Sequence, residues 1–269
     1  MTQPNAPAWL TERPIAHRGL HDAAGGVIEN TPAAAEAAIA GGFAIECDLQ
    51  MSADGELFVF HDDTLDRLTD AKGALIKMSA SAITKARIVP RRAASPPAPT
   101  ATPFIPTFAE FLGLVAGRTP IICELKSRFD GDWRIGDRAI AVSASYDGPL
   151  AFKSFDPDLV AYLRLRSPRL GASRTPCPIG IVAEASYDDP AWDLLTLKQR
   201  SNWTTFEHFD RLRPDFLSWN VDDLPHKVPF LMKELNNAPV MAWTVRTAAQ
   251  RDAARKWAGQ IVFEGDGRP

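Results

Sequence analysis

Apolar runs in the first quarter of the chain end abruptly at ionisable residues. The candidate strand 14–17 ends at His17, and the candidate strand 43–49 carries Glu46 and Asp48. Buried strands that end in this way bring charged side chains to one open edge of a sheet, where ligands commonly bind. The pattern therefore predicts a functional site among these strand ends.

A helix is predicted between these two strands. Thr31 is a favourable N-cap, Pro32 suits the first helical position, and an alanine-rich run extends to Ala40. Gly41-Gly42 then ends the helix, because glycine tolerates the left-handed backbone just past a helix C-terminus. The order strand, helix, strand is typical of a parallel sheet.

The next connection is too short for another parallel crossover. Only seven residues, 50–56, separate the two apolar runs, whereas a crossover needs about a dozen or more. Asp54-Gly55 is also favoured in two-residue hairpin turns. We therefore expect a hairpin over residues 46–61. A turn at Asp54-Gly55 would place Asp48 directly opposite His61, on the same face, and a longer loop would shift this register.

Strands and helices continue to alternate along the rest of the chain. Further strands are expected at 120–125, 150–155, 178–182, 216–220, 239–245 and 260–263. Start signals indicate helices at 108–116, after 156, after 189 and at 248–258, with a weaker signal near 79–87. Together with the hairpin this gives nine strand candidates for the eight positions of a barrel, so one of them is either the extra hairpin strand or misassigned.

Length and composition fit one large α/β domain. The chain has 269 residues, 45% of them hydrophobic, which is ordinary for a single α/β barrel. We expect one domain over 1–269, with a poorly ordered lead-in at 1–13. Residues 90–106, rich in Pro, Ala, Ser and Thr, are interpreted as an extended surface loop.

Charge and cysteine content exclude several classes of partner. A net charge of -3 gives no basic surface for nucleic acid. No apolar run approaches the ~18 residues that a membrane span requires, and the N-terminus lacks a secretory pattern. Three cysteines without metal-site spacing indicate free thiols in a reducing compartment, so cytoplasmic residence is expected. The oligomeric state is left open.

Three carboxylates at strand ends form the first candidate site. Glu46 and Asp48 are two apart on a strand and share a face, and Glu124 ends a separate apolar run. Their mutual repulsion would be relieved by a hard divalent cation with oxygen ligands, Mg²⁺ or Ca²⁺. The alternative is salt bridging, of Glu46 to Arg18 and of Glu124 to Lys126.

Two histidines form the second candidate group. His17 and His61 both end apolar strands, where a lone histidine is more often structural. Beside a carboxylate cluster they make a candidate acid/base pair, because the ordinary pKa of histidine lies near neutral pH. Arg18 and Lys126 would supply the positive charge that a phosphate-bearing transition state requires. Cys47 and Cys123 alternate with the carboxylates and are interpreted as core packing.

Several short motifs occur in a fixed order along the chain: His17-Arg18-Gly19, Glu29-Asn30-Thr31, Glu46-x-Asp48, Asp54-Gly55, His61-Asp62, Leu68-Thr69, Ile105-Pro106-Thr107, Glu124-Leu125-Lys126 and Ala242-Trp243-Thr244-Val245. In this order and spacing they resemble the glycerophosphodiester phosphodiesterase family. The resemblance is strong before residue 70 and thin between 165 and 235. Several motifs in fixed order are far more specific than any one of them.

The resemblance implies a TIM (β/α)8 barrel of the phospholipase C-like phosphodiesterase type. It also implies one divalent cation, held by Glu46, Asp48 and Glu124, and a general acid and base at His17 and His61. The positions of Arg18 and Lys126 match phosphate contacts, and that of Trp243 an aromatic near the glycerol end of the substrate. Core packing is an equal alternative for Trp243, as is a turn-stabilising role for Asn30.

Two departures from the family pattern lie near the C-terminus. Arg246 follows Trp243-Thr244-Val245 where the family often has Asn, and Glu264 stands where the family usually has an Ile-Thr-Asp-x-Pro type sequence. Both changes fall on the predicted barrel rim. They bear on substrate details and leave the metal and histidine positions intact.

The expected function is hydrolysis of a glycerophosphodiester to sn-glycerol 3-phosphate and an alcohol. One alternative is a related phosphodiesterase that acts on lysophospholipids or phosphoinositols with the same metal and histidines. The other is a catalytically silent barrel that binds phosphodiesters, against which the presence of both histidines and all three carboxylates argues. The expected partner is a small-molecule substrate, without nucleic acid and without a membrane span.

Overall fold

The computed structural model describes residues 6–89, 103–166, 168–172 and 175–269. Within these residues eight parallel strands close into a barrel, which confirms the predicted TIM barrel. The strands around the barrel are β1 (Ile15–Ala16), β2 (Ala44–Met51), β4 (Ile121–Leu125), β5 (Leu150–Ser154), β8 (Ile179–Ala183), β9 (Phe216–Asn220), β10 (Val240–Val245) and β11 (Gln260–Phe263). Pairing of β11 with β1, and of β1 with β2, closes the ring.

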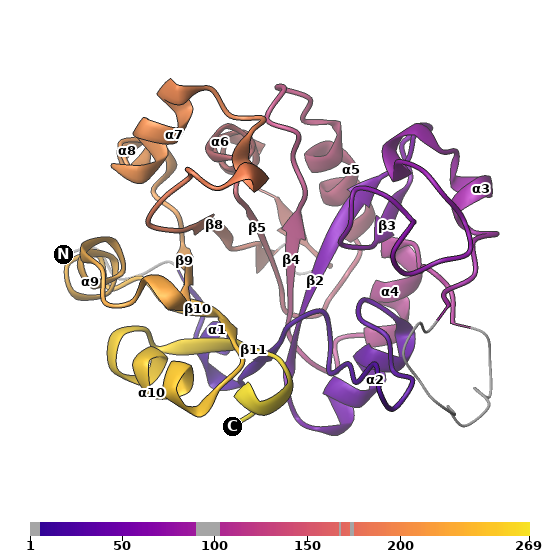
Figure 1. Ribbon diagram of the computed structural model, residues 1–269, viewed down its shortest axis with the longest axis horizontal. Coiled ribbons are helices and arrows are strands. Elements are labelled where there is room, and N and C mark those ends of the chain that lie inside the picture. Colours follow the sequence, from indigo (N-terminus) through magenta and orange to yellow (C-terminus); the bar gives the residue numbers. More distant parts are fainter. Residues whose placement is uncertain (1–5, 90–102, 167, 173–174) are drawn as a thin grey trace.

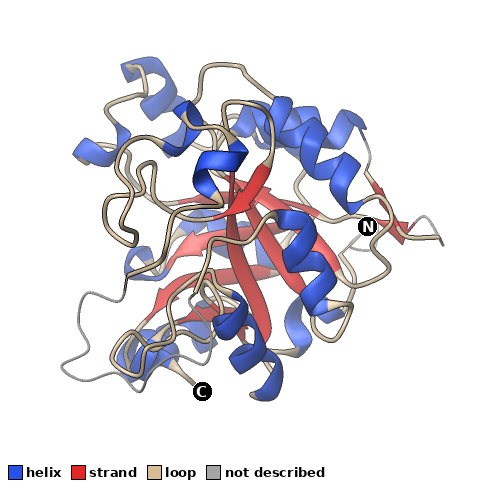
Figure 2. Cartoon of the chain, turned by 90° about the vertical axis from the view of Figure 1, so that its right-hand side faces the viewer, coloured by secondary structure: helices blue, strands red, loops and turns tan. Residues whose placement is uncertain are grey.

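Helices surround the strands on the outside (Figures 1 and 2). They are α2 (Pro32–Ala40), α4 (Phe108–Val115), α5 (Arg134–Ser143), α6 (Pro157–Arg166), α7 (Leu197–Thr204), α8 (Phe209–Leu212), α9 (Lys227–Glu234) and α10 (Ala248–Trp257). Thr31 caps α2, and Thr107 and Glu110 form the predicted capping box of α4. No start signal in the sequence predicts α5 or α9.

Alternate strand residues serve two different cores. On β2, Ile45, Cys47 and Leu49 face outward and pack with the surrounding helices. Ala44 faces inward and packs with the barrel interior. The Sγ atoms of Cys47 and Cys123 lie 3.4 Å apart in the outer core, which confirms their packing role, and all three cysteines are free and buried. The inward positions beyond Ala44 are Glu46 and Asp48, so the polar residues follow the apolar ones toward the carboxyl end of the barrel.

The N-terminal segment is more structured than expected. The prediction of a poorly ordered lead-in is wrong for its described part, because α1 (Trp9–Glu12) stands there. Leu10 is 1% exposed and packs with the apolar residues of the barrel interior. The Nε2 of Gln260 donates to the carbonyl oxygens of Leu10 and Arg13. This short helix therefore covers the end of the barrel opposite the polar residues.

The hairpin exists, but its predicted register is wrong. β3 (Leu57–Val59) pairs antiparallel with β2, with Leu49 opposite Val59, and it is the ninth strand outside the barrel. The amide of Ser52 donates to the carbonyl of Glu56, so the loop has three residues instead of two. The amide of Phe60 accordingly donates to the carbonyl of Asp48, and Asp48 does not face His61.

Other predicted elements are shifted or fall outside the described residues. The start signal at Asp189 produces only a 3₁₀ turn, η2 (Pro190–Trp192), and α7 begins later, after Thr196. Residues 90–102 of the proline-rich loop lie outside the described residues. The remaining short elements are η1 (Leu75–Lys77), α3 (Ala80–Ile83), β6 (Arg169–Leu170), β7 (Thr175–Pro176), η3 (Val221–Asp223) and η4 (Gly265–Gly267).

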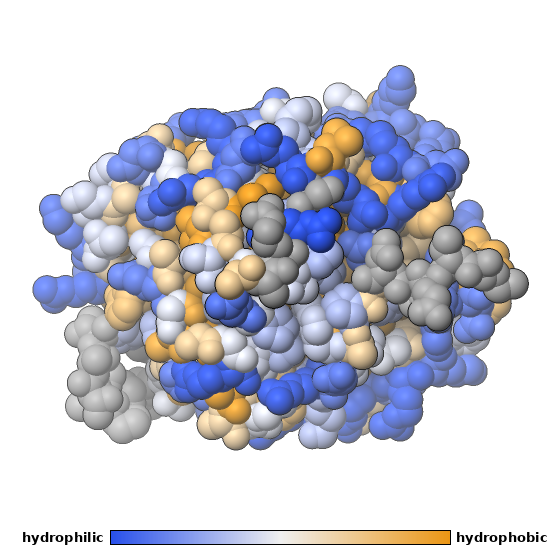
Figure 3. Space-filling model, turned by 180° about the vertical axis from the view of Figure 1, so that it is seen from behind, coloured by the Kyte–Doolittle hydropathy of each residue, from blue (hydrophilic) through white to orange (hydrophobic). Residues whose placement is uncertain are grey.

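The surface carries no broad apolar face in the view of Figure 3, where hydrophilic residues dominate and apolar ones form small patches. Among the helices in the described residues, none has the length and apolar character needed to traverse a lipid bilayer.

The partly buried His208, outside the barrel, should lower the stability of the fold in acid. Burial, with a smaller contribution from Arg211, lowers the pKa of His208 to about 4. At this position the unfolded chain therefore binds a proton more tightly than the folded protein does. The contribution of neutral His208 to the unfolding free energy is fully present above about pH 6.5 and is lost as the pH falls toward 4. We expect a loss on the order of 2 kcal/mol in unfolding free energy across that interval, which His208→Phe should remove. Urea unfolding at several pH values would measure it, and parallel curves for the two proteins would contradict the prediction.

Candidate active site

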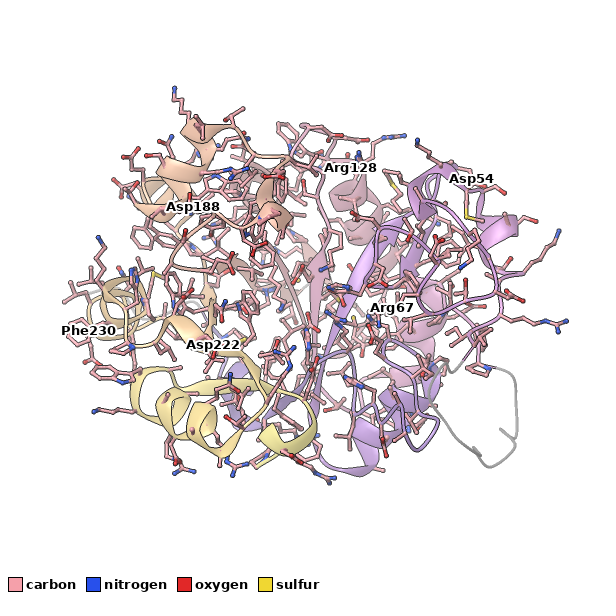
Figure 4. The ribbon with its side chains drawn as sticks, viewed as in Figure 1. Asp54, Arg67, Arg128, Asp188, Asp222 and Phe230 are labelled. Carbon is pink, nitrogen blue, oxygen red and sulfur yellow. The ribbon has the colours of Figure 1, made fainter. Side chains whose placement is uncertain are left out.

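Three carboxylates converge at the carboxyl end of the barrel. Glu46 and Asp48 come from β2 and Glu124 from the adjacent β4, where Asp48 and Glu124 are partners in register. Each side chain offers an oxygen within 4.8 Å of the others, and all three residues are buried. Figure 4 looks onto this end, where the labelled Arg67, Arg128, Asp188 and Asp222 lie around the opening. The predicted cluster is therefore formed by the fold.

Two lysines, the half-buried Lys126 and the buried Lys153, face the carboxylates. Lys126 Nζ lies 2.6 Å from Glu124 Oε1 and 2.9 Å from Asp48 Oδ1. Lys153 Nζ lies 3.0 Å from Glu46 Oε1 and 3.6 Å from Glu124 Oε2. Sequence reasoning did not single out Lys153, although a lysine closing the apolar run Leu150-Ala151-Phe152 was a usable signal. Its neighbours on β2 and β4 could be known only from strand order and register, which pair it with Glu124.

Arg18 does not form the salt bridge that was considered for Glu46. Its backbone amide donates to Glu46 Oε2 at 3.2 Å, whereas its guanidinium binds Glu29 at 2.7 Å and lies 3.4 Å from Asp48. The other pair considered, Glu124 with Lys126, is present. Arg18 therefore borders the carboxylate cluster beside Asp48.

The charges of this cluster compensate one another. Burial alone would raise the pKa of Asp48, but Lys126 and the other nearby cations hold it well below its ordinary value. Burial likewise opposes ionisation of Glu124, whose pKa is nevertheless lowered by Lys126 and Lys153. The pKa of Lys153 is raised despite burial, because Glu46 and Glu124 stabilise its charge. All of these groups are therefore ionised at neutral pH.

His17 is held between two carboxylates. Its Nδ1 hydrogen-bonds Glu264 Oε1, and its Nε2 lies 3.8 Å from Glu46 Oε2. Arg246 donates from Nε to the other oxygen of Glu264 at 2.9 Å. Burial would raise the pKa of Glu264, but His17, His21 and Arg246 keep it well below its usual range. The two departures from the family pattern, Arg246 and Glu264, thus meet behind His17 and fix its orientation.

His61 is held in a similar way from the hairpin side. Its Nδ1 lies 2.9 Å from Asp62 Oδ1, and Arg67 donates to both oxygens of Asp62 and to Glu29. Glu29 in turn accepts from Arg18. This chain of charged hydrogen bonds connects His61, through Asp62, Arg67 and Glu29, to Arg18 beside Asp48. Among the described residues, Nε2 of neither His17 nor His61 forms a hydrogen bond.

Asn30 lies beside the carboxylate cluster, and Trp243 stands near the end of β10. Asn30 is 3% exposed, and its Nδ2 donates to Asp48 Oδ2 at 3.0 Å, so it holds a member of the cluster as well as the turn before α2. Trp243 is half-buried near the end of β10 and packs against the apolar residues of the barrel interior. Its ring meets that of Phe155 edge-to-face, with the two ring centroids 5.5 Å apart. Packing and substrate contact are therefore compatible for Trp243.

The cluster has the composition of a hard-cation site. Its donors are carboxylate oxygens, which Mg²⁺ and Ca²⁺ prefer. One oxygen of each carboxylate lies within 4.8 Å of the others, close enough to share one ion, and Glu46 Oε1 also contacts Lys153 Nζ at 3.0 Å. Glu46, Asp48 and Glu124 thus fit the divalent cation that the motifs imply.

Comparison with known proteins agrees with this arrangement. A family model described as the glycerophosphoryl diester phosphodiesterase family matches residues 17–263. The chain belongs to this family. The resemblance inferred from the motifs is thereby confirmed, as is the assignment of the chain to a class of enzymes, the phosphoric diester hydrolases.

Individual relatives either match this glycerophosphoryl diester phosphodiesterase family member over a short segment or have low sequence identity to it. Glycerophosphodiester phosphodiesterase 1 of Bos taurus is 45% identical over 73 residues, which is 26% of this chain and 21% of that protein. The chain therefore spans about a fifth of the length of the curated relative that it matches.

Solved structures share the fold. A phosphodiesterase of Oleispira antarctica, in complex with the product sn-glycerol-3-phosphate, is 21% identical with a TM-score of 0.69, covering 95% of this chain and 93% of that one. A putative glycerophosphoryl diester phosphodiesterase of Silicibacter pomeroyi is 21% identical with a TM-score of 0.70, covering 93% and 89%. At these identities the likeness shows the fold alone.

Proposed function

We propose that this protein hydrolyses glycerophosphodiesters to sn-glycerol 3-phosphate and an alcohol. The observation that carries the proposal is the convergence of three carboxylates, two oriented histidines and three cationic side chains at one barrel mouth. Family membership supports the same reaction, as does the product bound in the Oleispira antarctica relative.

The cationic side chains suit a phosphodiester. Lys126 and Lys153 form ion pairs with the carboxylates, and Arg18 lies at the edge of the cluster. Their fixed charges would balance the negative charge that develops on the nonbridging phosphoryl oxygens. A divalent cation, Mg²⁺ or Ca²⁺, held by Glu46, Asp48 and Glu124 would add Lewis-acid polarisation of the phosphoryl group.

The two histidines divide the proton transfers. One accepts the proton of the attacking hydroxyl, and the other donates a proton to the leaving alkoxide, so that the alcohol departs neutral. Glu264 and Asp62 hold Nδ1 of His17 and His61, respectively, which leaves Nε2 of each ring as the proton-transferring atom. Trp243 packs beside the glycerol end of the substrate in this arrangement.

Removing divalent cations is expected to abolish turnover. Protein treated with a chelator should lose hydrolysis of a water-soluble glycerophosphodiester, because the three carboxylates then lack the ion they share, and Mg²⁺ or Ca²⁺ should restore it. Calorimetric titration with each metal should show one site per chain, weakened in Glu124→Gln and unchanged in Glu36→Gln, a carboxylate on the outer helix α2.

The outcomes of this test separate the candidate functions. Metal binding without turnover of any diester would favour a silent phosphodiester-binding barrel. Turnover restricted to acylated or inositol-bearing diesters would favour the lysophospholipid or phosphoinositol alternative. Full activity in the presence of excess chelator would contradict the role of the cation.

A further inference from the structure

The half of the barrel mouth opposite the carboxylate cluster has a different chemistry. Glu184 and Asn220 follow the outward-facing Ala183 and Trp219, so both face the barrel interior at the ends of β8 and β9. Asn220 Nδ2 donates to Glu184 Oε2 at 3.3 Å, and Trp243 is its register partner on β10. The carboxylate of Glu184 therefore points to the same opening as the phosphate-binding cations.

Aromatic rings connect the two halves. Phe155 lies two residues beyond Lys153, and its ring centroid is 4.9 Å from that of Trp192 and 5.5 Å from that of Trp243. Trp192 Nε1 donates to Glu184 Oε1 at 2.5 Å. All three rings are half-exposed. Phe155 and Trp192 thus form an aromatic surface that adjoins Glu184 and begins two residues after Lys153 in the chain.

Glu184 differs from Glu46, Asp48 and Glu124 because it has no cationic partner. Among the described residues it forms no ion pair with Lys, Arg or His, and its hydrogen-bond donors are the neutral Trp192 and Asn220. Burial raises its pKa, and Asp223 and Asp189 add to this effect, while the two hydrogen bonds oppose it. No side chain of the described residues compensates the charge of Glu184, and a cationic ligand could do so.

We propose that Glu184, Trp192 and Phe155 form a subsite for a leaving alcohol that carries a positively charged nitrogen. Aromatic faces beside a carboxylate are the usual receptor for quaternary ammonium groups. A zwitterionic phosphodiester then matches the mouth from end to end, with its phosphate at Lys126 and Lys153 and its nitrogen at Glu184. The inference rests on the proposed hydrolysis and adds a preference for cationic alcohols over neutral ones.

The test compares two diesters of the same shape. Glycerophosphocholine is compared with its neutral isostere, in which 3,3-dimethylbutanol replaces choline, in the parent protein, in Glu184→Gln and in Asp252→Asn. Asp252 is an exposed carboxylate on α10, so its variant matches the charge change. We expect kcat/KM of the parent to be about tenfold higher for the choline ester. Glu184→Gln should lose this preference through KM, with the isostere unaffected, and Asp252→Asn should keep it.

A second readout does not depend on turnover. Titration with tetramethylammonium chloride, followed by tryptophan fluorescence, should show saturable binding in the parent and in Asp252→Asn but not in Glu184→Gln. If diesters are hydrolysed with equal kcat/KM and tetramethylammonium does not bind, the subsite is wrong and the hydrolysis stands. If tetramethylammonium binding depends on Glu184 and no diester is hydrolysed, the subsite stands and the proposed function is wrong.

Discussion

Replacing either His17 or His61 by alanine is expected to lower kcat for a glycerophosphodiester by on the order of 10²–10⁴. Each ring is held at Nδ1 by a carboxylate, Glu264 or Asp62, so each presents Nε2 in a fixed orientation. Alanine removes the proton-transferring atom and leaves the cluster of carboxylates and lysines in place. Steady-state hydrolysis of glycerophosphocholine by the purified variants would measure the loss.

The two histidine variants need controls for folding and for metal binding. His226→Ala changes a histidine that caps α9 and stacks on Trp219, outside the cluster, and should keep turnover near that of the parent. Divalent metal binding, measured by calorimetry, should persist in His17→Ala and His61→Ala, because neither residue belongs to the three carboxylates. Hydrolysis at the parent rate in either variant would refute the acid/base assignment.

Replacing Lys153 by methionine is expected to destabilise the fold by about 3–5 kcal/mol. Lys153 is 2% exposed, and its ammonium group lies between Glu46 and Glu124. Methionine fills much of the same volume but leaves two buried carboxylates without the ammonium group that contacts them. Urea unfolding in the presence of a chelator would measure the change.

The same variant tests whether the carboxylates bind a cation. Mg²⁺ or Ca²⁺ should restore more unfolding free energy to Lys153→Met than to the parent, because it replaces the missing positive charge. Lys153→Arg, which keeps the charge, should be less destabilised, and Lys85→Met, at an exposed lysine, should be neutral. A Lys153→Met protein as stable as the parent without metal would show that the buried lysine does not compensate these carboxylates.

Local patterns predicted most of the fold because each element depends on near neighbours in the chain. Apolar runs marked the strands, and Thr31 and Thr107 marked the starts of α2 and α4. The hairpin register failed because it depends on whether the loop has two or three residues, which one dipeptide does not fix. The helix expected at Asp189 failed because Thr196 offers a full capping box seven residues later.

Candidate site residues were found where they end apolar runs or lie in recognisable motifs. Lys153 was missed because a single lysine at the end of an apolar run has no partner within its own segment. Glu264 was noticed only as a departure from a family pattern. Its contact with His17 joins residues from the two ends of the chain, and no spacing rule predicts such a contact.

The sequence by itself determined the barrel class, the family and the residue types of the site, since periodicity and short motifs are properties of contiguous segments. Only the tertiary structure decided which charges meet. Closure of the ring places β11 beside β1, and so Glu264 beside His17. The pairing of β4 with β5 places Lys153 beside Glu124. Strand order and register set these contacts, and both follow from packing the whole barrel, which no single segment encodes.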